Sequence, residues 1–266
     1  MKKNYLVKAI YSTVIPILFL ASCGKSYNPE ELKNLAIQYS KTKNYDEAIS
    51  TINQLIEINP NSSEAFLMNG FIKAHTNNYK LACEDFETAS KLGDSVKAKY
   101  LIKIYCENEL KDFPINDLEE LNLFLEGVQK VKTGKLKQEK EDFDKVIQLN
   151  PQNYEAYYLR SGSKFYKYND VQGALDDLNT AINIFPRHPN AFYLKANIFQ
   201  AINQVDSAIN NYTISLKLNP ELADAYFYRG VLFIIKGMKK KGCEDLLKAD
   251  SMNYPFAAEA IKENCK

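Results

Sequence analysis

Histidine and acidic side chains are the groups in this chain whose types could support acid–base or metal chemistry. The two histidines, His75 and His188, lie 113 residues apart in sequence, which argues against a histidine-rich metal site. We expect His75 to pack within a helix and His188, beside Pro189, to lie in a loop. No nucleophile stands at a recognisable spacing from a base. The sequence therefore predicts a protein that is not an enzyme and that binds no cofactor and no metal.

Acidic residues also occur in adjacent pairs. Neighbouring residues on a helix point to different faces, so the two carboxylates of such a pair would not meet at one substrate. We expect these side chains to face solvent. The two pairs are Glu119–Glu120 and Asp176–Asp177.

The first residues of the chain have the pattern of an export signal. Residues 1–8 hold three lysines and residues 9–20 are almost entirely apolar, as in the charged and hydrophobic regions of a signal peptide. A run of 12 residues is too short to span a bilayer. The alternatives are an ordinary signal peptide and a buried helix, in either of which the cysteine at residue 23 would be there by chance.

The apolar run ends in Leu20-Ala21-Ser22-Cys23-Gly24, which resembles the lipobox of bacterial lipoproteins. In those proteins the cysteine is acylated, with palmitate among its lipids, and becomes the new N-terminus. The resemblance implies that residues 1–22 are a cleaved lipoprotein signal peptide, that Cys23 is lipidated, and that residues 23–28 form a tether. Acyl chains contribute about 0.8 kcal/mol per buried methylene, so they would supply the membrane anchor.

The charge of the chain agrees with anchoring by lipid. The sequence has 34 lysines and arginines against 33 acidic residues, a net charge of +1, so nothing indicates binding to nucleic acid. Loss of residues 1–22 removes three lysines and no acidic residue, which changes +1 to −2. A folded part with this charge gains nothing from anionic lipid headgroups.

The remainder of the chain repeats with a period of about 34 residues. Asn-Pro occurs at residues 59–60, 150–151 and 219–220, with Phe-Pro at 185–186, and the intervals are 91, 35 and 34 residues. In a predicted first helix, a large residue precedes a small one by four positions, so the two lie one helical turn apart. These pairs are Leu32/Ala36, Phe66/Gly70, Leu123/Gly127, Tyr158/Gly162, Phe192/Ala196 and Tyr226/Gly230.

A predicted second helix carries the reverse order, a small residue four positions before an apolar one. Proline then ends most units, because it disfavours a helical conformation in the residue before it. The pairs are Ala48/Ile52, Ala82/Phe86, Ala174/Leu178, Ala208/Tyr212 and Gly242/Leu246.

This pattern resembles the tetratricopeptide repeat over residues 29–254, although no unit has the usual tryptophan. The resemblance implies an all-α, right-handed superhelical solenoid of antiparallel helix pairs. The third unit is the least regular, because Glu139 stands where a small residue is expected. The six units cover residues 29–62, 63–94, 120–153, 154–188, 189–222 and 223–252.

Four further cysteines divide this solenoid. The midpoint between Cys83 and Cys106 falls at residues 94–95, beside the turn signal Gly93, and the midpoint between Cys243 and Cys265 falls at residue 254, beside Pro255. Residues equidistant from the turn of an antiparallel helical hairpin lie side by side, so we predict disulfides within each pair; four buried thiols are the alternative.

The predicted domains are residues 29–107 (two units and a capping helix), 108–119 (a joint), 120–254 (four units) and 255–266 (a C-terminal capping helix).

The resemblance also implies a binding groove on the concave surface lined by the first helices. Tyrosine and amide side chains at these positions could bond a peptide backbone and bury apolar side chains, unless they reflect only a chain rich in both. The basic clamp of chaperone-binding members is not matched, because Leu159, Ser163 and Leu194 occupy its positions. The predicted groove consists of Leu159, Ser163, Tyr166, Asn190, Tyr193, Asn197, Gln200, Phe227 and Val231.

Together these features resemble a tetratricopeptide-repeat lipoprotein of Gram-negative bacteria, of the kind found in Bacteroidetes. We expect a scaffold that is anchored by lipid in the outer membrane, faces the periplasm, and binds a protein or peptide partner in the cell envelope. Neither nucleic acid nor a small-molecule substrate is expected. The alternative is a structural subunit of an envelope assembly machine, such as one that builds outer-membrane β-barrels or pili.

Overall fold

The computed structural model describes residues 27–107, 115–133 and 139–266, and this part of the chain forms fourteen α-helices and no strand. The predicted signal peptide and Cys23 lie outside the described residues. The helices are α1 (Pro29–Lys41), α2 (Tyr45–Ile58), α3 (Ser63–His75), α4 (Tyr79–Lys91), α5 (Ser95–Tyr105), α6 (Leu118–Thr133), α7 (Glu139–Leu149), α8 (Tyr154–Tyr166), α9 (Val171–Ile184), α10 (Pro189–Ala201), α11 (Val205–Leu218), α12 (Ala223–Ile235), α13 (Lys239–Ser251) and α14 (Ala257–Asn264).

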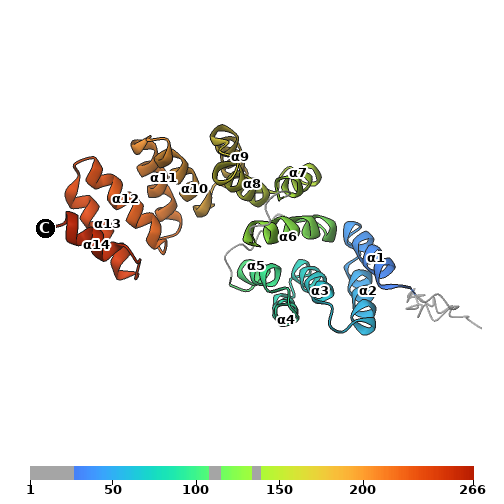
Figure 1. Ribbon diagram of the computed structural model, residues 1–266. Coiled ribbons are helices and arrows are strands. Elements are labelled where there is room, and N and C mark those ends of the chain that lie inside the picture. The colour runs from blue at the N-terminus through green and yellow to red at the C-terminus, as the bar shows by residue number, and fades with distance from the viewer. Residues whose placement is uncertain (1–26, 108–114, 134–138) are drawn as a thin grey trace, which may run out of the picture.

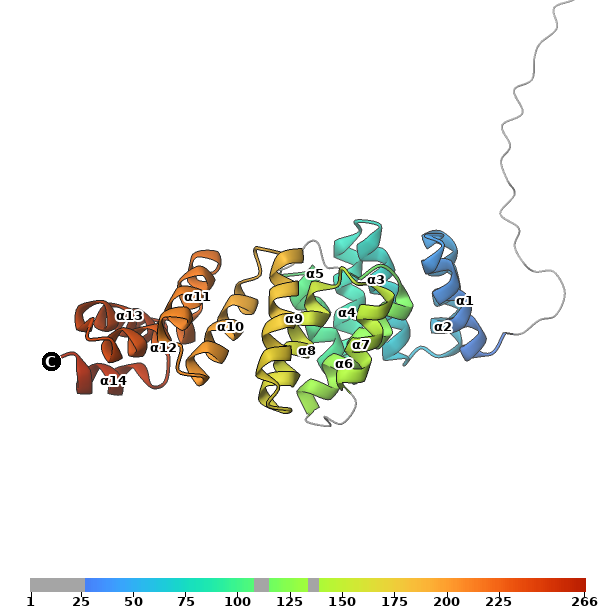
Figure 2. The same cartoon turned by 90° about the horizontal axis from the view of Figure 1, so that it is seen from above.

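Successive helices pack as pairs, α1 with α2, α3 with α4, α6 with α7, and likewise from α8 to α13. Figures 1 and 2 show these pairs following one another along an elongated body, with α14 after the last pair. The prediction of an all-α solenoid built from helix pairs is therefore confirmed. Helices α5 and α14 each follow a helix pair but do not begin a new pair; α5 packs on α4 and α14 on α13.

Close contact within a pair depends on the small residue predicted in its first helix. A Cβ atom added to Gly70 would lie 2.5 Å from the Phe86 ring of α4, and one added to Gly127 would lie 2.8 Å from the Phe143 ring of α7. At Gly230, the obstacle is the backbone oxygen of Gly242, at 2.9 Å. These distances leave no room for a larger side chain, because packed interiors have few voids.

The turns within the pairs share one backbone feature. In the five pairs whose turn the structure describes, the residue before the second-helix N-cap has a positive φ, a conformation that glycine and asparagine adopt most readily. The residues with positive φ are Lys43, Asn77, Asn169, Asn203 and Gly237.

An ion pair also recurs between the two helices of a pair. Arg160 of α8 donates two hydrogen bonds to Asp177 of α9, at 2.8 and 2.6 Å, and Arg229 bonds Asp245 in the same way. Asp177 is buried, so the expectation that it faces solvent was wrong; its charge is balanced by Arg160. The equivalent pairs elsewhere are Lys73–Asp85 and Lys130–Asp142.

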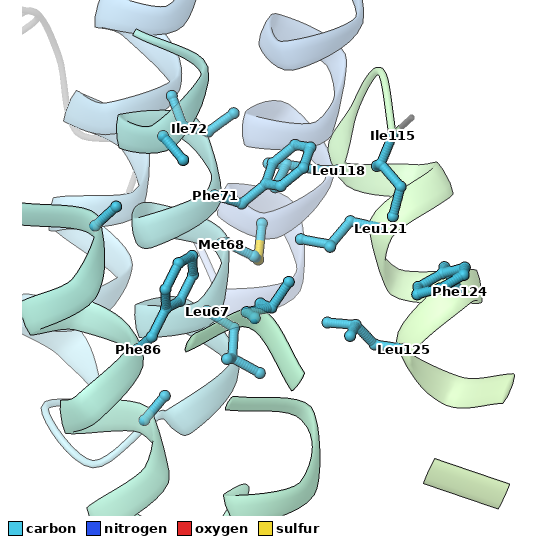
Figure 3. Packing of buried hydrophobic residues seen from close by; sticks show 14 of the residues in the cluster. Leu67, Met68, Phe71, Ile72, Phe86, Ile115, Leu118, Leu121, Phe124 and Leu125 are labelled. Atoms are coloured by element: carbon cyan, nitrogen blue, oxygen red, sulfur yellow. The ribbon is translucent and has the colours of Figure 1, made fainter. Parts of the chain in front are cut away.

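Helix α6 departs from simple stacking, because it lies against the first helices of the first two pairs. Leu118, Leu121 and Leu125 of α6 lie in the same buried cluster as Met68 and Phe71 of α3, as Figure 3 shows. Helix α3 is consequently buried on nearly all sides. One continuous core therefore runs from α1 to the start of α8.

Polar contacts fix the start of α6 in this position. The Leu118 N–H donates to the Ser40 hydroxyl oxygen at 3.2 Å, and Glu119 forms an ion pair with Lys41. A ring nitrogen of His75 lies 2.9 Å from the Ile115 carbonyl oxygen. Residues 115–119, the described part of the predicted joint, are thus held on α1 and α3.

Glu120 of α6 is buried, contrary to the expectation that it faces solvent, because amide groups from a distant segment surround it. Its Oε1 accepts hydrogen bonds from Asn150 and Asn153 at 2.9 and 2.7 Å, and its Oε2 accepts one from the Asn116 N–H at 2.9 Å. Burial raises the pKa of Glu120 above its ordinary value, and the amide hydrogen bonds offset part of that rise. The residue joins α6 to the loop before α8.

Both predicted cysteine pairs lie at disulfide distance. The Cα atoms of Cys83 and Cys106 are 5.9 Å apart and those of Cys243 and Cys265 are 5.7 Å apart, with the sulfur atoms bonded. The first bond joins α4 to the end of α5, and the second joins α13 to the end of α14.

Candidate functional site

Helices α8, α10 and α11 carry a network of hydroxyl and amide groups. The Tyr212 hydroxyl of α11 lies 2.6 Å from Asn197 Oδ1 and 2.8 Å from Gln200 Oε1, both on α10. The Asn197 amide in turn donates to the Tyr166 hydroxyl of α8 at 3.4 Å. Tyr166 is 68% exposed, so the network runs from the buried Tyr212 ring to solvent.

Asp224, in the first turn of α12, lies close enough to Tyr193 of α10 to influence its pKa. Burial raises the pKa of Tyr193 above its usual range, and the negative charge of Asp224 raises it further. Tyr193 therefore keeps its proton and remains a donor at physiological pH.

Aromatic rings continue this surface toward the C-terminal end. The Phe227 ring of α12 lies 4.7 Å from the Tyr254 ring, measured between centroids, and the Tyr254 ring lies 6.0 Å from that of Phe256. Phe256 is 60% exposed. We call this surface the tyrosine–amide face. It consists of Tyr166, Tyr193, Asn197, Gln200, Tyr212, Asp224, Phe227, Tyr254 and Phe256.

A hollow of about 480 Å³ lies over α7 and is lined by Glu141, Asp144, Lys145, Ile147 and Gln148. The tyrosine–amide face shares no residue with it. Within the described ranges, no cluster of histidine, cysteine or acidic side chains could hold a metal ion. The same part of the chain contains no helix that is both long and apolar enough to cross a membrane.

The corresponding surface of the first two pairs is covered by the chain itself. On α3, Leu67, Phe71 and Ala74 are equivalent in the repeat to Tyr193, Asn197 and Gln200 of α10, and all three are buried in the cluster that also contains Leu118 and Leu121 of α6. This face of α3 is therefore closed to a partner.

Comparison with known proteins identifies the architecture. A tetratricopeptide-repeat family model matches residues 34–62. The crystal structure of the Cut9–Hcn1 hetero-tetramer of the APC/C covers 90% of this chain and 43% of its own, with a TM-score of 0.54 and 13% identity. The structure of PilW, a type IV pilus biogenesis factor, covers 89% of this chain and 99% of its own, with a TM-score of 0.50 and 16% identity. The fold is a tetratricopeptide-repeat solenoid.

Curated relatives are similar over most of the chain. The DnaJ protein P58IPK homolog B of Oryza sativa is 23% identical over 252 residues, 88% of this chain and 49% of its own. The TPR repeat-containing protein MJ1428 of Methanocaldococcus jannaschii is 24% identical over 89% of this chain and 52% of its own. The chain thus spans about half the length of the curated relatives it matches.

The tetratricopeptide-repeat register is correct for α10 and α12 but shifted by one residue in α8. Ser161, and not Gly162, occupies the small position, because Ser161 is fully buried. A Cβ atom added to Gly162 would meet nothing closer than a Leu194 methyl group at 3.9 Å. The cause is one extra residue in the turn 167–170, whereas the turn 202–204 has three.

The shift changes the site residues of α8. Tyr158 and Gly162 are the equivalents of Tyr193 and Asn197, while Leu159 packs against the first core cluster. Ser163 makes no side-chain contact with the Tyr212 network, whereas Tyr166 belongs to it. The remaining predicted groove residues are half-buried on α10 and α12: Asn190, Tyr193, Asn197, Gln200, Phe227 and Val231.

This register leads to a test on two glycines. Gly230→Ala is expected to destabilise the protein by about 1–3 kcal/mol, because the new methyl group meets the Gly242 carbonyl oxygen. Gly162→Ala is expected to stabilise it by about 0.5–1 kcal/mol, because alanine favours helix and the space is open. Urea denaturation followed by circular dichroism measures both, and equal destabilisation by the two changes would contradict the corrected register.

Several residues of the site could not be found by repeat spacing. Tyr212 occupies a core position of the second helix, and Tyr254 and Phe256 lie in the turn before α14, outside the repeat pattern. Asp224 stands one turn before Tyr228 on α12 and could have been found from its helical position.

His188 lies in the loop before α10, as predicted, and its side chain also caps α10 and joins a buried network. Its Nδ1 accepts from the Ala191 N–H at 3.2 Å, so its Nε2 carries the proton and donates to Glu155 Oε2 at 2.9 Å. The Tyr100 hydroxyl of α5 donates to the other Glu155 oxygen at 2.6 Å. His188 and Glu155 are 3% and 5% exposed, so this pair is inaccessible to a substrate and links α5, α8 and α10.

Proposed function

We propose that this protein is a lipid-anchored lipoprotein of the bacterial envelope whose tetratricopeptide-repeat scaffold binds a protein or peptide partner through the tyrosine–amide face. The observation that carries the binding proposal is the network of tyrosine and amide groups on α8, α10 and α11, which reaches solvent at Tyr166 and continues in the aromatic rings of Phe227, Tyr254 and Phe256. Uncovered tyrosines with amide neighbours provide apolar area and hydrogen bonds together.

The anchoring proposal depends on the sequence. The charged start, the apolar run and Leu20-Ala21-Ser22-Cys23 support cleavage after Ser22 and lipid on Cys23. The second residue after Cys23 is lysine and no acidic cluster follows, which supports an outer membrane location with the solenoid facing the periplasm.

A structural subunit of an envelope assembly machine is the second candidate. Its support is the likeness in fold to PilW and to pilF of Pseudomonas aeruginosa, which covers 88% of this chain and 96% of its own with a TM-score of 0.52. Constant stoichiometry during purification would favour a subunit, and exchange of the partner would favour a transient binder.

The test is crosslinking in cells followed by affinity purification of the anchored protein. The double change Tyr193→Ala/Asn197→Ala is expected to remove the partner, because it deletes the Tyr193 ring from this surface and the bonds of Asn197 to Tyr166 and Tyr212. Asn210→Ala, at an exposed position of α11, is the control and should retain it. Retention of the partner by the double variant would place the interface elsewhere, and loss of membrane association in Cys23→Ala tests the anchor separately.

A further inference from the structure

Asp224 carries a negative charge on the tyrosine–amide face that no cation of the described chain neutralises. The charge of Asp224 acts on Tyr193, Tyr212 and Tyr254 of this face. Its carboxylate accepts a hydrogen bond from the neighbouring Ala225 N–H at 3.1 Å, and its side chain is only half-buried. One neutral donor leaves the carboxylate with lone pairs to spare. A further donor from outside the protein can therefore reach it.

The cations of the same helices are used elsewhere. Each is bonded to a group on the second helix of a pair, away from Asp224, so none compensates its charge. These bonds are Arg160 with Asp177, Lys164 with Asp177, Lys195 with Asn179, and Arg229 with Asp245.

Aromatic rings flank the carboxylate. Tyr193 lies on its α10 side, and Phe227 follows it by one turn on α12, where it stacks near Tyr254. The exposed Phe256 extends the aromatic surface beyond Tyr254. Aromatic faces attract cations, and a carboxylate with low exposure attracts them more strongly than one in bulk water.

An amide donor for a peptide backbone is also present. Gln200 Oε1 lies 2.8 Å from the Tyr212 hydroxyl, whose single proton it shares with Asn197 Oδ1, while Gln200 Nε2 has no partner among the described residues. Asn197, by contrast, uses both its oxygen and its nitrogen within the network. Gln200 can thus donate to a carbonyl group of a segment that lies along α10.

We propose that the tyrosine–amide face takes an extended peptide segment in which an arginine or lysine stands next to an apolar side chain. The cation pairs with Asp224 between the aromatic rings, and the apolar group packs on Phe227 and Phe256. Like charges across an interface are unfavourable, so acidic segments and free carboxyl termini are excluded. This inference rests on the proposed peptide-binding function and adds the chemistry of the ligand.

The test is selection from a random 12-residue peptide display library on the full-length chain in detergent, with Asp224→Asn and Asp224→Lys selected in parallel. Wild type is expected to enrich Arg or Lys beside an aliphatic or aromatic residue. Asp224→Asn should lose this preference, and Asp224→Lys should replace it with Asp or Glu. For one enriched peptide, Asp224→Asn is expected to weaken binding about tenfold, a change of about 1.4 kcal/mol.

Asp176→Asn, at an exposed position of α9, is the matched control and should leave the affinity unchanged. Enriched peptides that lack excess Arg and Lys, but whose binding is lost in Tyr193→Ala, would overturn the charge preference and leave the peptide-binding function intact. Failure to enrich any sequence would overturn both. Enrichment of basic peptides that is unaffected by Asp224→Asn would show that another part of the surface attracts them.

Discussion

Replacing Glu155 by alanine is expected to lower the free energy of unfolding by about 2–5 kcal/mol, because each buried donor that loses its acceptor costs about 1–3 kcal/mol. The change leaves the Nε2–H of His188 and the hydroxyl of Tyr100 without their acceptor in a region from which water is excluded. His188 cannot turn to find another partner, because its Nδ1 holds the Ala191 N–H at the start of α10.

Urea denaturation monitored by circular dichroism measures this loss. Glu57→Ala, at an exposed position of α2, is the control and should change the stability by less than about 0.5 kcal/mol. Glu155→Gln should lie between the two, since its amide oxygen can still accept from Tyr100 while its NH₂ group faces the donor on His188. A Glu155→Ala protein as stable as the control would mean that the network does not hold α5, α8 and α10 together.

Removal of either disulfide is expected to cost about 3 kcal/mol, from the entropy of a loop of 22 or 23 residues, but with different local effects. Helix α5 is held independently, because Ala98 and Leu101 are fully buried between its neighbours. Helix α14 has eight residues, of which Ala257 is the one in the buried core. Such a short helix is marginal without its tether.

Hydrogen exchange distinguishes the two bonds. In Cys243→Ser/Cys265→Ser, amides of α14 should lose protection well before the rest of the chain unfolds. In Cys83→Ser/Cys106→Ser, amides of α5 should keep theirs until α4 opens. Equal loss of protection in α5 and α14 would contradict the view that packing alone retains α5.

Much of the fold could be predicted from the sequence because the repeat depends on local chemistry. A large residue, a small residue one turn later and a proline at the end specify helix pairs whichever neighbours they meet, and the cysteine pairs follow from symmetry about a turn. The placement of α6 could not be predicted in this way. Its contacts with Ser40 and His75 join segments that are distant in sequence, and the spacing of the repeat does not indicate them.

The candidate site was predicted in part for a related reason. Tyr193 and Asn197 follow from the repeat register, whereas Leu159 and Ser163 were misplaced because one extra residue in a turn moved the register of α8. The acidic side chains Glu120 and Asp177 were expected at the surface, since their burial depends on Asn150, Asn153 and Arg160 reaching them from other elements.

The contact between α1 and α6 has a consequence for how the chain folds. The hydrogen bond from Leu118 to Ser40 spans 78 residues, whereas a regular solenoid is held by contacts between sequence neighbours. Closing so long a loop costs entropy before the contact forms, which slows folding relative to purely local pairing. We therefore expect the first half of the molecule, together with α8, to form and open as one cooperative body, while the last two helix pairs can open from the end, one pair at a time.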